Sequence, residues 1–331
     1  MVSELNRNIA IELQDRLLHH RIESGGTTAS ICGRPGCGKT TVLLHYAHQV
    51  AYLHPISEAW TKETVIWRGR DIDYWNWYLD PSFEWENLTL KREIVIHIYE
   101  ADRGVKFFDE LKTALNLDDR IRYYADAPDL YNNLIAGAIN VVYEPREYYP
   151  SEAAMDHIVA KSCGRREWYE GLVLDPCLFW FEFVAFVNLV KGAGFLTIIL
   201  DEADELFPQN PSGIRWWMQE WFRNKLRDFR KNNISFIYTF HSWSDIDYRI
   251  SDKRMIRGWM RGANPPRTSM ITIARTRSLA TGRLILEDDG FGDIQIPKIQ
   301  PRPRVKVHWG HDSDIDYERW VIPAQSFSKK Y

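Results

Sequence analysis

Apolar and polar residues follow two different periods along the chain, and the two periods predict alternating strands and helices. Short runs rich in β-branched and aromatic residues predict strands at residues 27–32, 64–67, 94–99, 121–124, 139–143, 195–200 and 234–240. Apolar residues spaced three or four apart predict helices at residues 6–22, 40–52, 130–136, 151–160, 180–190 and 213–231. Alternation of this kind favours an α/β fold with a mostly parallel sheet flanked by helices.

The pattern changes after residue 250. Strand-like pieces at residues 269–274, 283–287 and 305–309 are separated by residues that interrupt regular structure, among them Pro265, Pro266, Pro297, Pro301 and Pro303. We therefore expect one domain over residues 1–250, with an insertion at about residues 71–160, and a basic, strand-rich, proline-interrupted appendage over residues 251–331.

The composition is that of a folded protein. The 331 residues carry 42 Lys and Arg against 45 Asp and Glu, together with 15 Phe, 14 Trp and 16 Tyr, which excludes intrinsic disorder. The most apolar stretch, residues 178–190, is shorter than the ~20 apolar residues of a membrane span, so we expect a buried helix and no transmembrane segment. No secretory signal is visible, so we expect a cytoplasmic location.

The cysteines and one aromatic segment fit an ordinary folded protein. The four cysteines (Cys32, Cys37, Cys163 and Cys177) lack the spacing of a zinc site, and we expect reduced thiols. Residues 71–86 combine six large aromatic residues with five acidic ones. Aromatic side chains mostly serve burial, so this segment is expected either to pack on the core or to contact a partner.

A glycine-rich loop separates the strand at residues 27–32 from the helix at residues 40–52. It fits the P-loop pattern G-x-x-x-x-G-K-T and is followed by one more threonine: Gly33, Arg34, Pro35, Gly36, Cys37, Gly38, Lys39, Thr40 and Thr41. Glycines let the backbone N–H groups approach phosphates, and the N-terminus of the following helix attracts negative charge. We expect these nine residues to bind the phosphates of ATP.

The last side chains of this loop have more specific expected roles. Lys39 would place its ammonium group on the β- and γ-phosphates, and Thr40 would place its hydroxyl on Mg²⁺. Thr41 follows directly and would meet the α-phosphate.

A second motif is the apolar strand at residues 195–200, which ends in Asp201 and Glu202. Asp201 would hold Mg²⁺ through its water shell, and Glu202 would orient or deprotonate the attacking water. With the glycine-rich loop, this pair of acids predicts Mg²⁺-dependent hydrolysis of ATP and not binding alone.

Two further sets of residues are candidates for contact with the γ-phosphate. The helix at residues 213–231 carries Arg223, Arg227 and Arg230 on one face. This face is either a solvated surface or the source of an arginine finger for a neighbouring subunit, and the sequence does not choose among the three. The strand at residues 234–240 ends near Thr239 and His241, either of which would sense the γ-phosphate; a capping or surface role for His241 is equally open.

Together these residues resemble the FtsK/HerA superfamily of DNA-pumping ATPases, most of all its branch of viral genome-packaging and zonula occludens toxin-like ATPases. The resemblance covers about residues 25–70 and 190–250, and His241 departs from it because that position is commonly Gln. It implies a RecA-like P-loop core, ATP and Mg²⁺ as cofactors, a ring hexamer, and duplex DNA moved through the pore. It also implies a capsid or membrane-associated viral protein as a partner, in the host cytoplasm or the virion.

Other classes of ATPase share the phosphate chemistry. An AAA+ replication initiator or loader would carry a helical lid where this chain has a proline-interrupted tail. A DEAD-box helicase would need a second motor domain, for which the remaining residues are too few. A nucleotide-gated signalling switch would show weak turnover and no stimulation by DNA.

Charge is unevenly distributed, although the net charge is only -3. Residues 249–306 carry 13 basic side chains and five acidic ones. Because the DNA backbone binds by charge neutralisation regardless of sequence, this region is expected to contact duplex DNA. Ion pairs within or between subunits are the alternative, and Arg254, Arg257 and Arg261 could equally supply the arginine finger.

Overall fold

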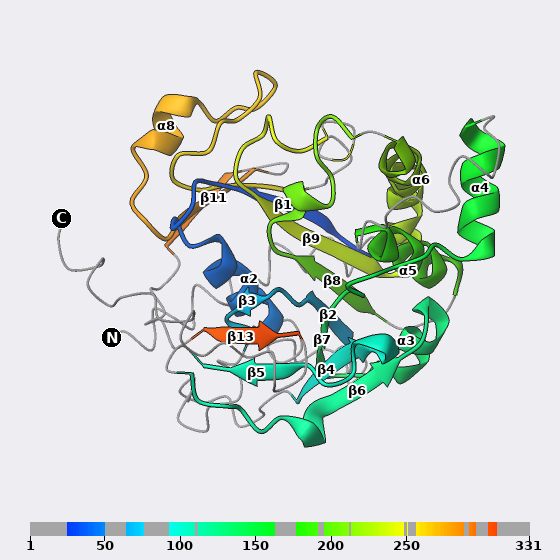
Figure 1. The fold of residues 1–331 in the computed structure, drawn as a ribbon. Helices are drawn as coiled ribbons and strands as arrows, with labels where there is room; N and C mark the ends of the chain where they lie inside the picture. Colours follow the sequence, from blue (N-terminus) through cyan, green and yellow to red (C-terminus); the bar gives the residue numbers. More distant parts are fainter. Residues whose placement is uncertain are drawn as a thin grey trace.

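The computed structural model describes residues 25–49, 64–75, 93–109, 112–162, 177–190, 195–211, 213–247, 250, 256–287, 291–295 and 304–309. The helix expected at residues 6–22, and most of the aromatic and acidic segment at 71–86, lie outside the described residues. In the described part of the chain, a large central sheet is covered on both faces (Figure 1).

The main sheet consists of β1 (Thr28–Cys32), β2 (Thr64–Arg68), β4 (Ile94–Tyr99), β6 (Ile121–Tyr124), β7 (Ile139–Val142), β8 (Leu196–Leu200), β9 (Ile234–Phe240), β10 (Ile256–Trp259), β11 (Arg283–Glu287) and β12 (Phe291–Gln295). Their order is β12-β11-β10-β1-β9-β8-β2-β7-β4-β6. Every neighbouring pair from β10 to β6 is parallel, whereas β11 and β12 form an antiparallel edge. The expected α/β fold class with a mostly parallel sheet is confirmed.

The described α-helices are α2 (Lys39–Gln49), α3 (Ala127–Asn133), α4 (Glu152–Ser162), α5 (Cys177–Leu189), α6 (Gly213–Phe229) and α8 (Ile273–Arg277). Short 3₁₀ helices are η3 (Glu100–Asp102), η4 (Asp118–Arg120), η6 (Ala203–Glu205) and η7 (Arg230–Asn232). α5 and α6 pack together on one face of the main sheet, and α2 lies on the other face (Figure 1). The protein therefore has a layered helix–sheet–helix arrangement.

A second, smaller sheet covers the α2 side of the main sheet. It joins β3 (Ile72–Asp73), β13 (Val305–His308) and β5 (Lys106–Phe108), with β13 in the centre and antiparallel to both neighbours. β3 and β5 come from the region expected as an insertion, and β13 comes from the region expected as an appendage. Segments far apart in the sequence thus lie side by side (Figure 1).

Burial on both faces explains the uninterrupted apolar runs of the central strands. In β8, Ile198 and Leu200 belong to the core beneath α5 and α6, whereas Ile199 belongs to the core around α2. Side chains alternate between the two faces of a strand, so a strand that is covered on both sides needs apolar residues at every position.

α5 is the buried helix that the apolar stretch at residues 178–190 predicts. Phe179 and Phe183 are fully buried and stack with ring centroids 5.9 Å apart, and Trp180 is 1% exposed. Burial of each such side chain stabilises the fold by about 1.5–3 kcal/mol. Among the described helices, none combines the length and the apolar character required to cross a membrane.

The region after residue 250 differs from the sequence prediction in three elements. Residues 269–274 form a turn and the start of α8, and the predicted strand there is wrong. The reason is local: Thr272 caps α8 by accepting a hydrogen bond from the Arg275 backbone N–H at 3.2 Å. β10 and β12 were not predicted; β10 pairs with β1 and β12 pairs with β11 in the main sheet. The division of the chain near residue 250 stays a prediction.

Candidate active site

The glycine-rich loop connects β1 to α2 at the carboxyl edge of the parallel sheet, where ligands of α/β folds bind. A Cβ on Gly33 would lie 2.6 Å from Cys37 Sγ and 2.9 Å from Met260 Cβ, so only glycine fits. Gly38 has a φ of +105°, which other residues rarely adopt. Packing and backbone conformation therefore both require glycine in this loop.

Lys39 is held at the first turn of α2 by the loop itself. Its Nζ donates to the carbonyl oxygens of Gly33 at 2.8 Å and Arg34 at 3.4 Å, and lies 3.0 Å from His241 Nδ1. The side chain is 6% exposed. The ammonium group is thus directed back over the loop, at the position where the loop's backbone would hold a phosphate.

Thr40 and Asp201 meet although they are far apart in the sequence. Thr40 Oγ1 donates to Asp201 Oδ2 at 2.5 Å, and Thr239 Oγ1 donates to Asp201 Oδ1. A threonine hydroxyl and one carboxylate, together with phosphate oxygens, form the type of oxygen site that Mg²⁺ prefers. Among the described residues, no group of three or more His, Cys, Asp or Glu side chains is arranged to hold a metal ion by itself.

Glu202 follows Asp201 in a left-handed backbone conformation, with φ 52° and ψ 53°. Such a conformation costs a non-glycine residue about 1–3 kcal/mol and is concentrated at functional sites. The Glu202 backbone N–H donates to Thr239 Oγ1 at 3.0 Å, which holds the turn. Its carboxylate forms an ion pair with Arg70 and lies 3.6 Å from His241 Nε2.

The end of β9 thus connects the two motifs. Thr239 contacts both Asp201 and Glu202, whereas His241 lies between Lys39 and Glu202. The sequence proposed one or the other as the sensor of the γ-phosphate, and the structure brings both to the site.

A cleft of about 880 Å³ opens at this edge of the sheet. Its lining includes six of the nine loop residues: Pro35, Gly36, Gly38, Lys39, Thr40 and Thr41. Gly33 and Cys37 are buried beneath the loop, and Arg34 is exposed. Burial raises the pKa of the Cys37 thiol, which favours its neutral form. Asp201, Glu202 and His241 also line the cleft.

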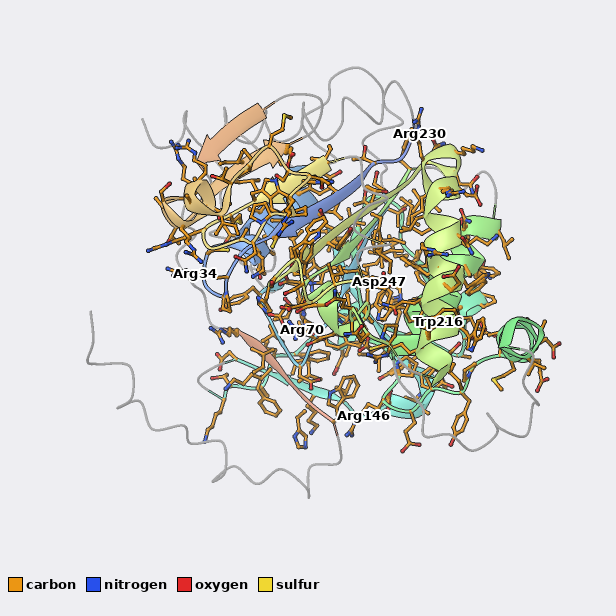
Figure 2. The ribbon with its side chains drawn as sticks, turned by 90° about the horizontal axis from the view of Figure 1, so that it is seen from above. Arg34, Arg70, Arg146, Trp216, Arg230 and Asp247 are labelled. Atoms are coloured by element: carbon orange, nitrogen blue, oxygen red, sulfur yellow. The ribbon has the colours of Figure 1, made fainter. Side chains whose placement is uncertain are left out.

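Arg223 and Arg227 on α6, and Arg230 at the start of η7, lie elsewhere. Arg223 forms an ion pair with Glu220 on the same helix. The carbonyl of Arg230 accepts a hydrogen bond from Gly26 N at 3.0 Å. Gly26 precedes β1, whereas the glycine-rich loop follows β1. Figure 2 shows Arg230 at the end of α6 opposite Trp216 and away from Arg70. Arg223, Arg227 and Arg230 are absent from the lining of the cleft.

Two arginines at the end of β2 were missed by sequence analysis. Arg68 pairs with Glu144 at 2.8 Å and Glu205 at 3.1 Å, and Arg70 pairs with Glu202 and Glu205. Burial opposes the charge of Arg68, but the Glu144 carboxylate raises its pKa. Their position in the sequence could have indicated them as site residues, because both follow an apolar strand that ends at the same sheet edge as β1 and β8.

A buried acid lies in the same wall of the cleft. Asp73 accepts hydrogen bonds from Trp67 Nε1 at 2.9 Å and Tyr74 N at 2.7 Å. Burial, with a smaller contribution from the Asp201 charge, raises the pKa of Asp73 to about 7. This carboxyl group therefore titrates close to neutral pH.

Comparison with known proteins gives similarities only among solved structures. No protein-family model matches the sequence, and no curated protein matches it. The genome packaging NTPase B204 from Sulfolobus turreted icosahedral virus 2, in complex with sulfate, is 11% identical over 84% of this chain and 99% of its own, with a TM-score of 0.43. EccC from Thermomonospora curvata (ATPases 2 and 3) is 12% identical over 85% of this chain and 38% of its own, with a TM-score of 0.38.

The N-terminal domain of zonular occludens toxin from Neisseria meningitidis is also similar, at 12% identity over 86% of this chain and 94% of that domain, with a TM-score of 0.27.

Proposed function

We propose that this protein hydrolyses ATP with Mg²⁺ and works as a ring oligomer, with six subunits, that moves duplex DNA. One observation carries the catalytic part: Thr40 Oγ1 donates to Asp201 Oδ2 at 2.5 Å, joining the phosphate loop to the acidic strand end. A glycine-rich turn alone, or an Asp-Glu pair alone, also occurs in proteins that bind no nucleotide. Their contact in the folded chain supports one site for a Mg²⁺-bound nucleotide.

Each residue at this site has a distinct part in phosphoryl transfer. The loop backbone and Lys39 bind the phosphates, and Thr40 and Asp201 hold Mg²⁺, which neutralises phosphate charge when bound. Glu202 accepts the proton of the attacking water, since its carboxylate lies on the turn directly after Asp201. Thr239 keeps the two acids in register, and His241 lies between Lys39 and Glu202 as the sensor of the γ-phosphate.

The test of hydrolysis compares Lys39→Ala and Glu202→Gln with the wild type. We expect both to lose turnover, and only Glu202→Gln to retain binding of ATP, measured by titration with a fluorescent ATP analogue. Lys231→Ala is a matched control. Lys231 is exposed in η7, which follows α6 and lies near the start of β1, whereas the glycine-rich loop follows the end of β1. Wild-type turnover in either site variant would refute the assignment.

DNA as the cargo is supported by an arginine-rich loop beside the nucleotide site. This arginine loop, residues 260–282, and the preceding strand contain five arginines and no acidic residue: Arg257, Arg261, Arg267, Arg275 and Arg277. Arg267, Arg275 and Arg277 are exposed, and so is Arg34 on the phosphate loop. Arg257 differs, since it lies in β10 and is 3.8 Å from Glu287. A surface of this kind suits a phosphate backbone.

The arginine loop is attached directly to the phosphate loop. Arg34 N donates to Arg261 O at 3.1 Å, and Gly282 N donates to Cys37 O at 3.0 Å. Movement of one loop therefore disturbs the hydrogen bonds of the other. This attachment supports coupling between DNA contact and nucleotide state, which a motor requires.

The oligomeric part of the proposal depends on the arginines of α6 and of η7, which follows it directly. Arg223, Arg227 and Arg230 are remote from their own cleft, so an arginine finger from these residues would act on the nucleotide of a neighbouring subunit. A genome-packaging role, with a capsid or membrane-associated viral protein as partner, is the particular form of this motor that we propose.

Turnover with and without duplex DNA tests the cargo. We expect DNA to stimulate ATP hydrolysis, and the stimulation to fall as salt rises. Replacing Arg267, Arg275 and Arg277 together by Ala should remove the stimulation and leave basal turnover. Turnover indifferent to both DNA and salt would favour the signalling switch instead.

A further inference from the structure

The two carboxylate oxygens of Glu202 face two different side chains. Its Oε2 forms the ion pair with Arg70, and its Oε1 lies 3.6 Å from His241 Nε2. The other ring nitrogen of His241 lies 3.0 Å from Lys39 Nζ, so Oε1 faces the phosphate loop. The two oxygens of this carboxylate therefore have different surroundings: Oε2 is anchored, and Oε1 is directed toward the nucleotide site.

Arg70 is itself held in place by Glu205. Its second guanidinium nitrogen lies 2.6 Å from Glu205 Oε1. Glu205 is fixed to the same turn as Glu202, since its backbone N–H donates to the Glu202 carbonyl oxygen at 3.2 Å. Arg70 thus bridges two carboxylates that are one 3₁₀ turn apart, which a planar guanidinium group with several donors can do.

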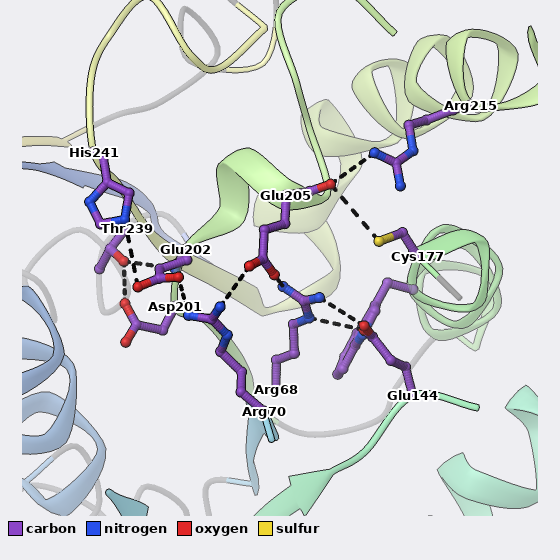
Figure 3. A network of polar contacts seen from close by, with 11 residues as sticks. Arg68, Arg70, Glu144, Cys177, Asp201, Glu202, Glu205, Arg215, Thr239 and His241 are labelled. Carbon is purple, nitrogen blue, oxygen red and sulfur yellow. Dashed lines mark hydrogen bonds and ion pairs between the residues drawn. The ribbon is translucent and has the colours of Figure 1, made fainter. Parts of the chain in front are cut away.

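The ion pairs continue into the protein core (Figure 3). Glu205 Oε2 lies 3.1 Å from Arg68, and Arg68 binds Glu144 through two nitrogens at 2.8 and 2.9 Å. Glu144 in turn accepts a hydrogen bond from Trp180 Nε1 on α5. Arg68 is 4% exposed, so this part of the network is buried, and Glu205 links it to Arg70.

We propose that Arg70 is a positioning residue for the general base: it anchors Oε2 of Glu202 so that Oε1 is presented to the attacking water. This inference rests on the proposed hydrolysis. Arg70 acts on the reaction only through Glu202. A general base must lie within hydrogen-bond reach of the proton it removes, and a carboxylate on a flexible glutamate side chain meets this condition only when it is held.

The partial exposure of the two side chains distinguishes a positioning role of Arg70 from a role in folding stability. Arg70 and Glu202 are 25% and 32% exposed in their side chains, and ion pairs that water reaches contribute little to folding stability. Loss of Arg70 should therefore leave the protein folded and able to bind nucleotide. The expected loss is in the chemical step alone.

The experiment measures kcat, KM and affinity for a non-hydrolysable ATP analogue in Arg70→Gln, Arg70→Lys and Glu205→Gln. We expect Arg70→Gln to lower kcat ~100-fold with analogue affinity unchanged, since misplacing a catalytic group by about 1 Å costs this much. Arg70→Lys should recover part of the loss, because it keeps the charge. Glu205→Gln should lower kcat less than Arg70→Gln does, because Arg70 still reaches Glu202.

A double variant and a control complete the design. In the Glu202→Gln background, Arg70→Gln should leave both the small residual kcat and the affinity for the ATP analogue unchanged, because both substitutions remove the same function. Arg103→Gln is the control: Arg103 is an exposed arginine paired with Glu100 at 2.6 Å and is absent from the lining of the cleft. Its kcat should equal that of the wild type.

The outcomes distinguish this inference from the proposed hydrolysis. Wild-type kcat in Arg70→Gln, beside an inactive Glu202→Gln, would overturn the role of Arg70 and leave the hydrolysis standing. A loss of analogue affinity equal to the loss of kcat would also overturn it, since Arg70 would then act in binding. Full turnover in Glu202→Gln would instead refute the hydrolysis. If Arg70→Gln does not fold, Arg70→Lys and Glu205→Gln carry the same test.

Discussion

The two sides of the cleft hold their groups in different ways. On the side of the glycine-rich loop, main-chain groups hold the functional side chain. Carbonyl oxygens of Gly33 and Arg34 hold Lys39, and the shape of the loop depends on glycine. On the other side, formed by the ends of β2, β7 and β8, charged side chains hold one another in the network of Arg68, Arg70, Glu144 and Glu205.

This difference has a physical reason. A phosphate chain presents many identical oxygens, which a ring of backbone N–H groups can bind without side-chain specificity. A general base must present one oxygen in one direction, which requires side chains of fixed position. Backbone conformation is a property of neighbouring residues, whereas an ion-pair network needs residues from several strands. Substitutions on the two sides should therefore have different effects: on ligand affinity at the glycine-rich loop, and on stability in the ion-pair network.

The largest expected effect is at the point where the two sides meet. Asp201→Asn removes the negative charge that Thr40 and Thr239 contact. We expect turnover to fall ~1000-fold, comparable to the loss of a group that stabilises transition-state charge, and the Mg²⁺ concentration for half-maximal turnover to rise. Turnover measured across a MgCl₂ titration checks both. An unchanged Mg²⁺ requirement would contradict a metal-binding role for Asp201.

The next effect concerns stability on the ion-pair side. Arg68→Met leaves Glu144 beside the buried end of the network without its cation, and should lower the free energy of unfolding by about 3–5 kcal/mol. Urea denaturation measures this. The matched variant is Arg68→Met with Glu144→Gln, which removes the uncompensated charge and should be less destabilised. Equal loss in the single and double variants would mean that Arg68 acts through packing and not through charge.

A smaller effect is expected on the main-chain side. Gly33→Ala places a Cβ 2.6 Å from Cys37 Sγ and 2.9 Å from Met260 Cβ, so the loop must shift. We expect affinity for an ATP analogue to fall ~100-fold, with a much smaller effect on the unfolding free energy than that of Arg68→Met. Wild-type affinity in Gly33→Ala would show that the loop tolerates this shift and would weaken the contrast between the two sides.

The smallest effect is a pH dependence from Asp73. The pKa of Asp73 is about 7 in the folded protein and has the ordinary value of 3.8 in the unfolded chain. Between these two pH values, the folded chain holds a proton that the unfolded chain has released. The contribution of Asp73 to stability is therefore present at low pH and is lost as the pH rises through about 7. Asp73→Asn should flatten the fall in Tm between pH 5 and pH 8.

The control for this effect is Asp71→Asn, which removes an exposed carboxylate two residues away. Thermal unfolding at both pH values compares the three proteins. The same fall of Tm in Asp73→Asn and in the wild type would contradict a proton held by Asp73.

Particular residues show why some parts of the site were predictable from sequence. Thr40 and Asp201 each follow a strand within a short motif, so their residue types and neighbours were sufficient to expect them at one site. Arg68 and Arg70 carry no such motif, and their partner Glu144 belongs to a different part of the chain. Their function depends on β2 lying between β8 and β7, an order that the sequence does not reveal.

In the region after residue 250, the charge could be predicted from the sequence but the secondary structure could not be predicted in full. Its basic character was visible in the sequence, but the exposed arginines and the half-buried Arg257 could not be separated, because β10 was not predicted. The strand expected at residues 269–274 was wrong because the cap at Thr272 outweighed the β-branched character of its neighbours.

Elements with local causes follow from the order of the residues alone: the apolar strands, the buried helix α5, the glycine-rich loop, and the acids that follow β8. The folded chain was needed to establish which charged side chains meet, that β13 joins β3 and β5, and that the arginine loop is attached to the phosphate loop. The reason is the range of the interactions. Periodicity and backbone conformation act between near neighbours, whereas ion pairs and strand order depend on residues that folding brings together.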